Sequence, residues 1–325
     1  MGKINWILIL QGWAILWVVI GHAPLLPVVT YDSPLAVDLL YKFAYSFHMP
    51  LFVFISGYLF WMTRIERYMP YTEMLKEKFI RLGIPYVVFT IVAMVVKDIF
   101  ATEMVRPAEF TLEEFVQAIL YPGSGPLSEL WFIATILWFF AMRPLWMVKG
   151  AWQYVLLIVL ILCNMVPYMQ TSNLLCYQNV MEYAIWFYLG VLSRKYNVVD
   201  VLSKQSVGIM LLAVVCGLLL DLIPNVETNY AVTIAICSIS IVLAHIADRY
   251  IPQCLSSMRG YSYQIYLIGL FAQIAVKILY KHSYIPNYAV AYVMCILAGV
   301  YIPVLVSKIV EKLNSKILKL CIGLK

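Results

Sequence analysis

His22 closes a long apolar run and is the first residue whose type and place could do chemistry. The run, INWILILQGWAILWVVIGH, covers residues 4–22. Ionisable side chains inside apolar spans are costly, which makes each one a functional candidate. At about 1.5 Å per residue, His22 lies roughly 28 Å along a helix from Lys3. An imidazole near the end of a span can accept a proton from a hydroxyl at neutral pH. The alternative interpretation is an interfacial histidine ahead of a helix-ending proline.

Gln11 and His48 are two further polar groups inside apolar runs. Gln11 precedes His22 by eleven residues, about three helical turns, so both are predicted on one helix face. An amide at this depth also commonly bonds a neighbouring helix. The second apolar run, residues 36–61, contains AYSFHMPLFVFISGYLF. His48 lies about halfway through this run, two residues before Pro50, which should kink the helix. For His48, a functional group and a satisfied structural group are both open interpretations.

Lys78 and Arg81 form a basic pair in the segment KEKFIRLGIPY. Residues three apart share a helix face, so this pair is predicted to stand together where the next apolar run begins. Two such cations suit a phosphate-bearing ligand. The alternative is that they only anchor the chain at the membrane surface, where Lys and Arg are generally enriched.

Composition decides which elements must position these groups. Of 325 residues, 63% are hydrophobic and only 12% charged, against about 25% charged in soluble domains. The apolar runs approach 20 residues, which predicts membrane helices rather than barrel strands. We therefore expect an all-α polytopic transmembrane bundle that forms a single domain over 1–325. The net charge of +6 suits anionic lipid at short loops, so nucleic acid is not an expected partner.

About ten spans are predicted, with breaks at prolines and polar loops. They cover residues 5–25, 36–61, 80–98, 130–148, 151–168, 179–193, 206–223, 230–247, 261–280 and 287–308. The seven cysteines are dispersed and show no metal-ligand or disulfide spacing, so no metal site is expected.

Charge orients the predicted spans. Most of the 23 Lys and Arg residues fall on the side of the two termini, and the exceptions are Lys42, Lys97, Arg106, Lys277 and Lys281. The positive-inside rule then places both termini in the cytoplasm, in a multi-pass protein of the cell membrane. The largest loop on the other side, 99–129, contains EFTLEEFVQAIL, which predicts a short amphipathic helix capped by Thr111. It is either a lid or a plain connection.

Several of these segments together resemble a known family. The first apolar run, which ends in VVIGHA, is followed by FHMPLFVFISGYLF, KFIRLGIPY, LWFI and GYSYQIYLIGLF, in order from residue 4 to about 271. They resemble the acyltransferase-3 family of integral membrane acyltransferases, and within it the fucose 4-O-acetylase-like branch. The resemblance implies about ten helices and transfer of an acyl group, usually acetyl, from cytoplasmic acetyl-CoA to an envelope carbohydrate.

The resemblance also assigns roles to single residues. It implies that His22 is catalytic and that Lys78 and Arg81 hold the phosphates of CoA. The chain departs from the family pattern at two places: Gln11 stands where many members have arginine, and Gly269 where many have histidine. The glutamine would line the acyl channel instead.

These observations join into one hypothesis. The acetyl group reaches a polar channel containing Gln11, His48 and His22. His22 then acts as general base, or carries the acyl group itself, and His48 donates to the developing oxyanion. A transporter or glycan exporter using the same polar groups is the main alternative, and a structural or assembly protein is a third. A basic pair inside and a histidine toward the outside favour the enzyme.

Overall fold

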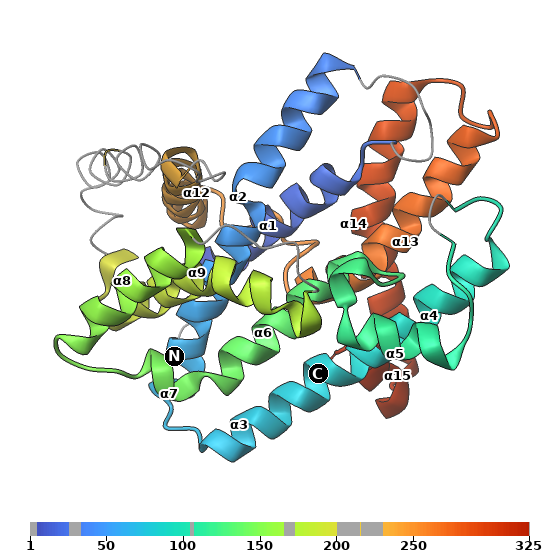
Figure 1. Cartoon of the computed structure of the whole chain (residues 1–325). Coiled ribbons are helices and arrows are strands. Elements are labelled where there is room, and N and C mark those ends of the chain that lie inside the picture. The colour runs from blue at the N-terminus through green and yellow to red at the C-terminus, as the bar shows by residue number, and fades with distance from the viewer. Residues whose placement is uncertain are drawn as a thin grey trace. The chain divides into compact units, whose positions relative to one another are not determined.

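All regular structure in the described part of the chain is helical (Figure 1). The computed structural model describes residues 5–25, 34–104, 107–165, 173–199, 215 and 230–324. The predicted span 206–223 therefore lies outside the described residues, apart from position 215.

The helices follow the predicted apolar runs closely. The α-helices are α1 (Asn5–His22), α2 (Leu35–Phe60), α3 (Tyr71–Lys78), α4 (Ile84–Ile99), α5 (Leu112–Leu120), α6 (Trp131–Ala141), α7 (Arg143–Trp146), α8 (Trp152–Met165), α9 (Tyr177–Lys195), α12 (Tyr230–Tyr250), α13 (Ser262–Lys281), α14 (Tyr288–Leu313) and α15 (Lys316–Cys321). Short turns of other helix types are the π-helical η1 (Trp61–Ile65) and η2 (Phe79–Gly83) and the 3₁₀ η3 (Pro122–Ser124), η4 (Ser128–Leu130) and η5 (Leu174–Cys176).

Six described helical stretches are long and apolar enough to cross a membrane. They are Asn5–His22, Leu35–Ile65, Tyr71–Ile99, Tyr230–Tyr250, Ser262–Lys281 and Tyr288–Leu313. Two shorter apolar helices, Ser128–Ala141 and Trp152–Asn164, add to them. The protein is thus an all-helical, multi-pass membrane protein with about six to ten candidate spans. The side on which the termini lie stays a prediction.

The third span begins earlier than hydropathy predicts. Predicted from residue 80, it belongs to helical structure that already begins at Tyr71 and runs through α3, η2 and α4. Hydropathy misses α3 because the segment YTEMLKEK is mostly polar, although it forms helix as readily as the apolar part. The predicted short helix in the following loop is confirmed as α5, and Thr111 caps it by accepting a hydrogen bond from the Glu114 N–H at 3.2 Å.

The chain forms two compact units, each built from separate stretches. Unit 1 contains Met1–Met49, Phe100–Pro107 and Ser240–Lys325, and unit 2 contains Pro50–Ile99 and Ala108–Ile239. The prediction of one domain over residues 1–325 stays a prediction.

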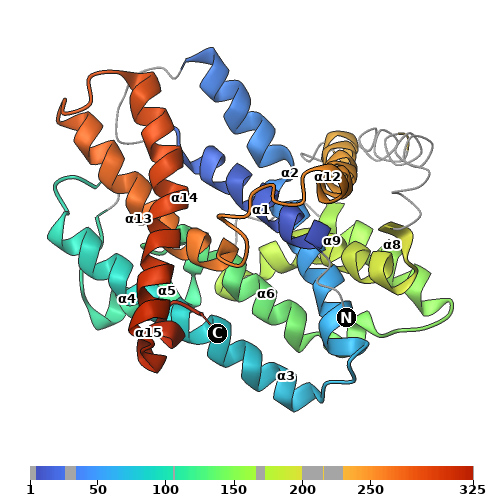
Figure 2. The same ribbon diagram turned by 180° about the vertical axis from the view of Figure 1, so that it is seen from behind.

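In unit 1, α13 and α14 lie side by side and α1 packs on both (Figures 1 and 2). Glycines allow the close approach of α13 and α14. A Cβ atom at Gly269 would lie 2.7 Å from the carbonyl oxygen of Gly299, nearer than any side chain can sit. Small residues at such contacts are typical of membrane helix pairs.

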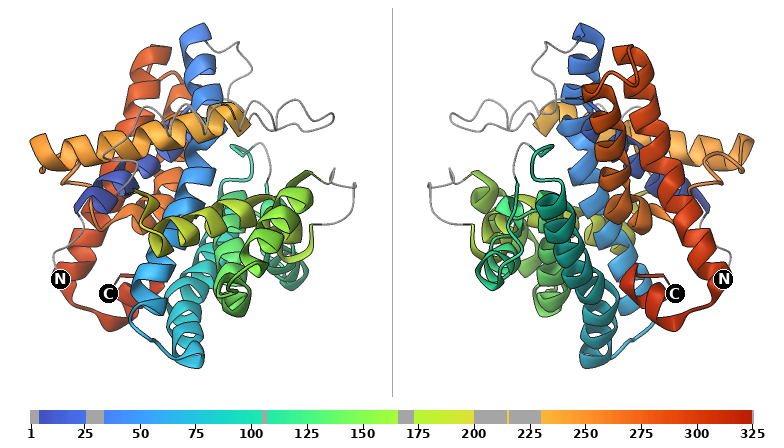
Figure 3. Two further views of the ribbon diagram at one scale, coloured as in Figure 1. Left: turned by 90° about the vertical axis from the view of Figure 1, so that its left-hand side faces the viewer. Right: turned by 90° about the vertical axis from the view of Figure 1, so that its right-hand side faces the viewer.

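In unit 2, α9 packs against α6, α8 and the second half of α2 (Figure 3). Buried side chains of these helices form an aromatic core. Its fully buried rings include Phe60, Phe139, Trp146 and Phe187. Here too the backbones meet at glycines: a Cβ at Gly57 of α2 would lie 2.0 Å from the carbonyl oxygen of Phe187.

Candidate active site

His22 is the last residue of α1, and its ring lies against Tyr45 of α2. The two ring centroids are 5.9 Å apart, and the Tyr45 ring is in turn 4.9 Å from that of His48. Tyr45 therefore contacts both histidines. The sequence predicted the two histidines as functional candidates; the structure brings them together around a tyrosine that the sequence did not single out.

Local sequence explains why α1 ends with its histidine against α2. Pro24 has no N–H to continue the helix, and Ala23 closes the last turn by donating to the Ile20 carbonyl at 3.2 Å. Gly21 lets α2 approach, because a Cβ there would lie only 3.2 Å from the Tyr45 ring. The triplet Gly-His-Ala thus combines close helix packing with a side chain that reaches Tyr45.

His48 is buried, with 2% of its surface exposed, and one ring nitrogen is already used. Its Nδ1 lies 2.5 Å from the carbonyl oxygen of Ala44, one turn earlier. A carbonyl only accepts, so Nδ1 carries the proton, and Nε2 of the neutral ring has a lone pair. Within unit 1, His48 is therefore partly the satisfied structural group that the sequence left open. Its Nε2 can donate a hydrogen bond only when the ring is protonated.

Two buried polar residues of α13 hold the end of α1, and sequence reasoning missed both as site residues. Gln273 donates from its side-chain amide to the Val19 carbonyl at 2.8 Å, and Lys277 donates from Nζ to the His22 carbonyl at 2.8 Å. Their exposed fractions are 1% and 6%. The available signal was their spacing: two polar side chains four apart in an apolar helix share one face.

Gln11 and Gly269 are the two departures from the resembling family. Gln11 is half-buried in α1, three turns before His22, and its role in an acyl channel stays a prediction. Gly269 has no room for a larger side chain because the Gly299 carbonyl occupies that space. The chain's α13–α14 packing therefore requires the glycine.

Lys78 and Arg81 belong to unit 2 and are both half-buried. Lys78 ends α3 with its Nζ 4.0 Å from the centre of the Phe140 ring, a cation–π contact. Arg81 lies inside the π-helical turn η2. The predicted shared face assumed α-helical spacing, whereas η2 has the wider i→i+5 turn of a π-helix. Their role in binding phosphate stays a prediction.

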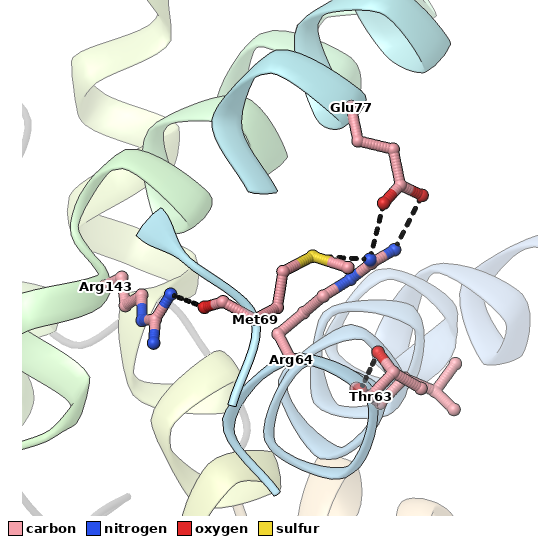
Figure 4. Close-up of polar contacts among 6 residues, drawn as sticks. Thr63, Arg64, Met69, Glu77 and Arg143 are labelled. Carbon is pink, nitrogen blue, oxygen red and sulfur yellow. Dashed lines mark hydrogen bonds and ion pairs between the residues drawn. The ribbon is translucent and has the colours of Figure 1, made fainter. Parts of the chain in front are cut away.

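A further basic residue of unit 2, Arg64, lies in a network of polar contacts (Figure 4). The guanidinium of Arg64 makes two parallel bonds to the Glu77 carboxylate, at 2.6 and 2.9 Å, and a third to the Met69 sulfur at 3.0 Å. Arg143 donates to the main-chain carbonyl of Met69 at 2.7 Å. Glu77 immediately precedes Lys78, so this network fixes the connection into α3. In the sequence Arg64 counted only as a loop charge.

One carboxylate of unit 1 pairs with the far end of α13. Glu103 lies 3.0 Å from Lys281 and 3.1 Å from His282. The hydrogen bond from Lys281 holds the pKa of the Glu103 carboxyl below its usual range. Lys281 is thus part of an ion pair at the surface, whereas Lys277, one turn earlier, is buried at the end of α1.

Comparison with known proteins identifies the family. A family profile described as an acyltransferase domain matches residues 4–308, nearly the whole chain. No curated protein and no solved structure matches. The chain belongs to the acyltransferase-3 family, which makes it a membrane-bound O-acyltransferase and confirms the resemblance at the level of the family.

Proposed function

We propose that this acyltransferase transfers acetyl from acetyl-CoA to a hydroxyl of an envelope or extracellular carbohydrate, with His22 as general base. The observation that carries the proposal is the place of His22: an imidazole at the end of an apolar helix, in ring contact with Tyr45, which also contacts His48. The resemblance to the fucose 4-O-acetylase-like branch supports a sugar hydroxyl as acceptor. Lipid is the surrounding medium, and CoA and the carbohydrate are the partners.

The reaction needs one proton carrier. His22 accepts the hydroxyl proton while the oxygen attacks the thioester carbonyl, and the tetrahedral intermediate then expels the CoA thiolate. The imidazolium returns its proton to that sulfur, so the products are an acetyl ester and CoA thiol. A route through acetyl-histidine breaks the same C–S bond first and forms the ester second.

His48 suits this reaction differently from the sequence hypothesis. The bond from Nδ1 to Ala44 leaves a neutral His48 with an acceptor at Nε2, so it has no proton to give an oxyanion there. We propose that neutral His48 orients a donor, such as a second hydroxyl of the sugar, because the reacting hydroxyl gives its single proton to His22. Donation to the oxyanion requires the protonated ring.

The test is transfer itself. Membrane vesicles carrying the chain are given acetyl-CoA radiolabelled in the acetyl group and envelope glycan from cells that lack the chain. Label in alkali-labile ester on the glycan is the expected result, and vesicles without the chain are the control. Glycan crossing the membrane without acetyl-CoA, and no ester formed, would favour the transporter alternative.

For unit 2 we propose that Lys78 and Arg81 bind the phosphates of CoA. Replacing both by glutamine is expected to raise the apparent KM for acetyl-CoA by about a hundredfold or more, because the two charged hydrogen bonds, at about 1.5–3 kcal/mol each, together contribute about 3–6 kcal/mol. Initial rates over a range of acetyl-CoA concentrations measure it. Lys76→Gln, an exposed lysine of the same helix, is the matched control. A KM unchanged from the wild type shows that the pair only anchors the chain.

A further inference from the structure

Lys277 of α13 is a buried charged residue that has no role in the proposed reaction. Charged side chains within membrane spans are costly and tend to mark function. Lys277 lies in the candidate span Ser262–Lys281 with 6% of its surface exposed. Its ammonium reaches the main-chain oxygen of His22 at 2.8 Å. Its target is thus the residue proposed as general base.

The end of α1 offers backbone carbonyl groups that need a hydrogen-bond donor such as the Lys277 ammonium. The last carbonyls of a helix have no partner within it and carry the negative end of its dipole. Pro24 removes the N–H that would extend the helix. Gln273 then bonds the Val19 carbonyl and Lys277 the His22 carbonyl, so two groups one turn apart on α13 hold the last turn of α1.

The packing of α14 against α13 keeps the Gln273 side chain in place. A Cβ at Gly299 would lie 3.0 Å from the Gln273 amide nitrogen and 2.8 Å from a Val19 methyl group. The glycine therefore leaves room for the amide between the helices. The helices α1, α13 and α14 of unit 1 therefore pack closely at the turn that ends with His22.

We propose that Lys277, assisted by Gln273, is a positioning residue that fixes the last turn of α1 and thereby the imidazole of His22. The inference rests on the proposed function. Because the Lys277 bond goes to the main chain of His22 itself, the rotation of that residue about the helix axis is set by α13. Small misplacements of a catalytic group cost rate rather than substrate affinity.

The first experiment measures kinetics of Lys277→Met and Lys277→Arg in vesicles. Methionine keeps the length and loses the donor, so kcat is expected to fall about tenfold or more while the KM for acetyl-CoA stays within about twofold. Arginine retains a donor and should restore part of kcat. Lys281→Met, which removes a lysine one turn on, is the control and keeps kcat. A wild-type kcat in Lys277→Met overturns the proposal, as does an equal loss in Lys277→Arg.

The second measurement is independent of activity. Amide hydrogen exchange of the peptide containing Val19–His22 is expected to speed up several-fold in Lys277→Met and in Gln273→Met, with α14 unchanged. Unchanged exchange shows that the hydrogen bonds from Lys277 and Gln273 do not hold the last turn of α1. Faster exchange together with a wild-type kcat shows that the two bonds hold the last turn of α1 but do not position His22 for the reaction. If the wild-type chain transfers no acetyl group, the proposed function is refuted. The exchange measurement still shows whether Lys277 and Gln273 hold the last turn of α1.

Discussion

His22→Ala is expected to lower acetyl transfer by about 10²–10⁴-fold, the range by which a positioned general base accelerates a reaction. The loss should appear in kcat, because alanine removes the proton acceptor and leaves binding of acetyl-CoA to other groups. His22 is half-buried at a helix end, so its removal opens little space in the core. Ester formation on envelope glycan, at equal amounts of chain in the membrane, measures the effect.

His245→Ala is the matched control for that experiment. His245 lies in the part of α12 that belongs to unit 1, its Nδ1 is 2.8 Å from the Ile241 carbonyl, and its ring stacks on Trp6. It therefore resembles His48 in local bonding but has no contact with the proposed reaction. We expect the kcat of His245→Ala to lie within a few-fold of the wild-type value. Transfer retained in His22→Ala would remove His22 from the mechanism, whatever the control shows.

Sequence alone could predict the histidines because the signal is local. An ionisable residue in an apolar run is visible without any knowledge of its neighbours, and the spacing to Pro24 places His22 at a helix end. The contact of Tyr45 with His48 is local to α2, but the contact of His22 with Tyr45 depends on how α1 meets α2 at Gly21. Such a meeting is a property of tertiary packing, which a single sequence does not show.

The same limit explains the missed polar residues. Lys277 and Gln273 bond main-chain atoms more than 250 positions earlier, and no local pattern predicts the partner of a side chain across that separation. Lys277 was instead counted among the few cations on the side opposite the termini or in the adjoining half of a span. Its burial against the end of α1 shows that a lysine within a turn of a helix end can belong to the interior.

Helix type was a further property beyond sequence periodicity. The pair Lys78 and Arg81 has the spacing of one α-helical face, but η2 is a π-helical turn. Such turns interrupt α-helices as single wider turns, and η2 follows α3, whose Glu77 is bonded to Arg64. The apolar pattern correctly predicted that helix occurs there, but periodicity alone does not distinguish a π-helical turn from an α-helical one.

Gly190→Ala in α9 is expected to destabilise unit 2 by more than about 3 kcal/mol, beyond the usual range for overpacking. A Cβ at this position would lie 2.1 Å from the Phe54 carbonyl oxygen and 2.8 Å from the Tyr58 nitrogen. Both obstacles are backbone of α2, so no side-chain rotation relieves the clash and the two helices must separate. The midpoint of thermal unfolding in detergent, or the folded yield from membranes, measures the loss.

Gly57→Ala on the facing helix tests the same contact from the other side, since its Cβ would meet the Phe187 carbonyl oxygen at 2.0 Å. Once α2 and α9 have separated for one methyl group, the second enters space already opened. The double variant should therefore lose less than the sum of the two single losses, as expected for residues that share an interface. Additive losses would show that each glycine acts alone.

Gly83→Ala supplies the contrast that separates packing from backbone effects. A Cβ there would meet only the Phe79 ring, at 3.8 Å, an ordinary contact. Alanine is favoured over glycine in helices by about 1 kcal/mol, so this variant should be as stable as the wild type or slightly more stable. Opposite signs at Gly83 and Gly190 would locate the cost in the α2–α9 contact. A loss at Gly83 as large as that at Gly190 would instead mean that this protein tolerates no glycine substitution in its helices, and the close approach would not be the cause.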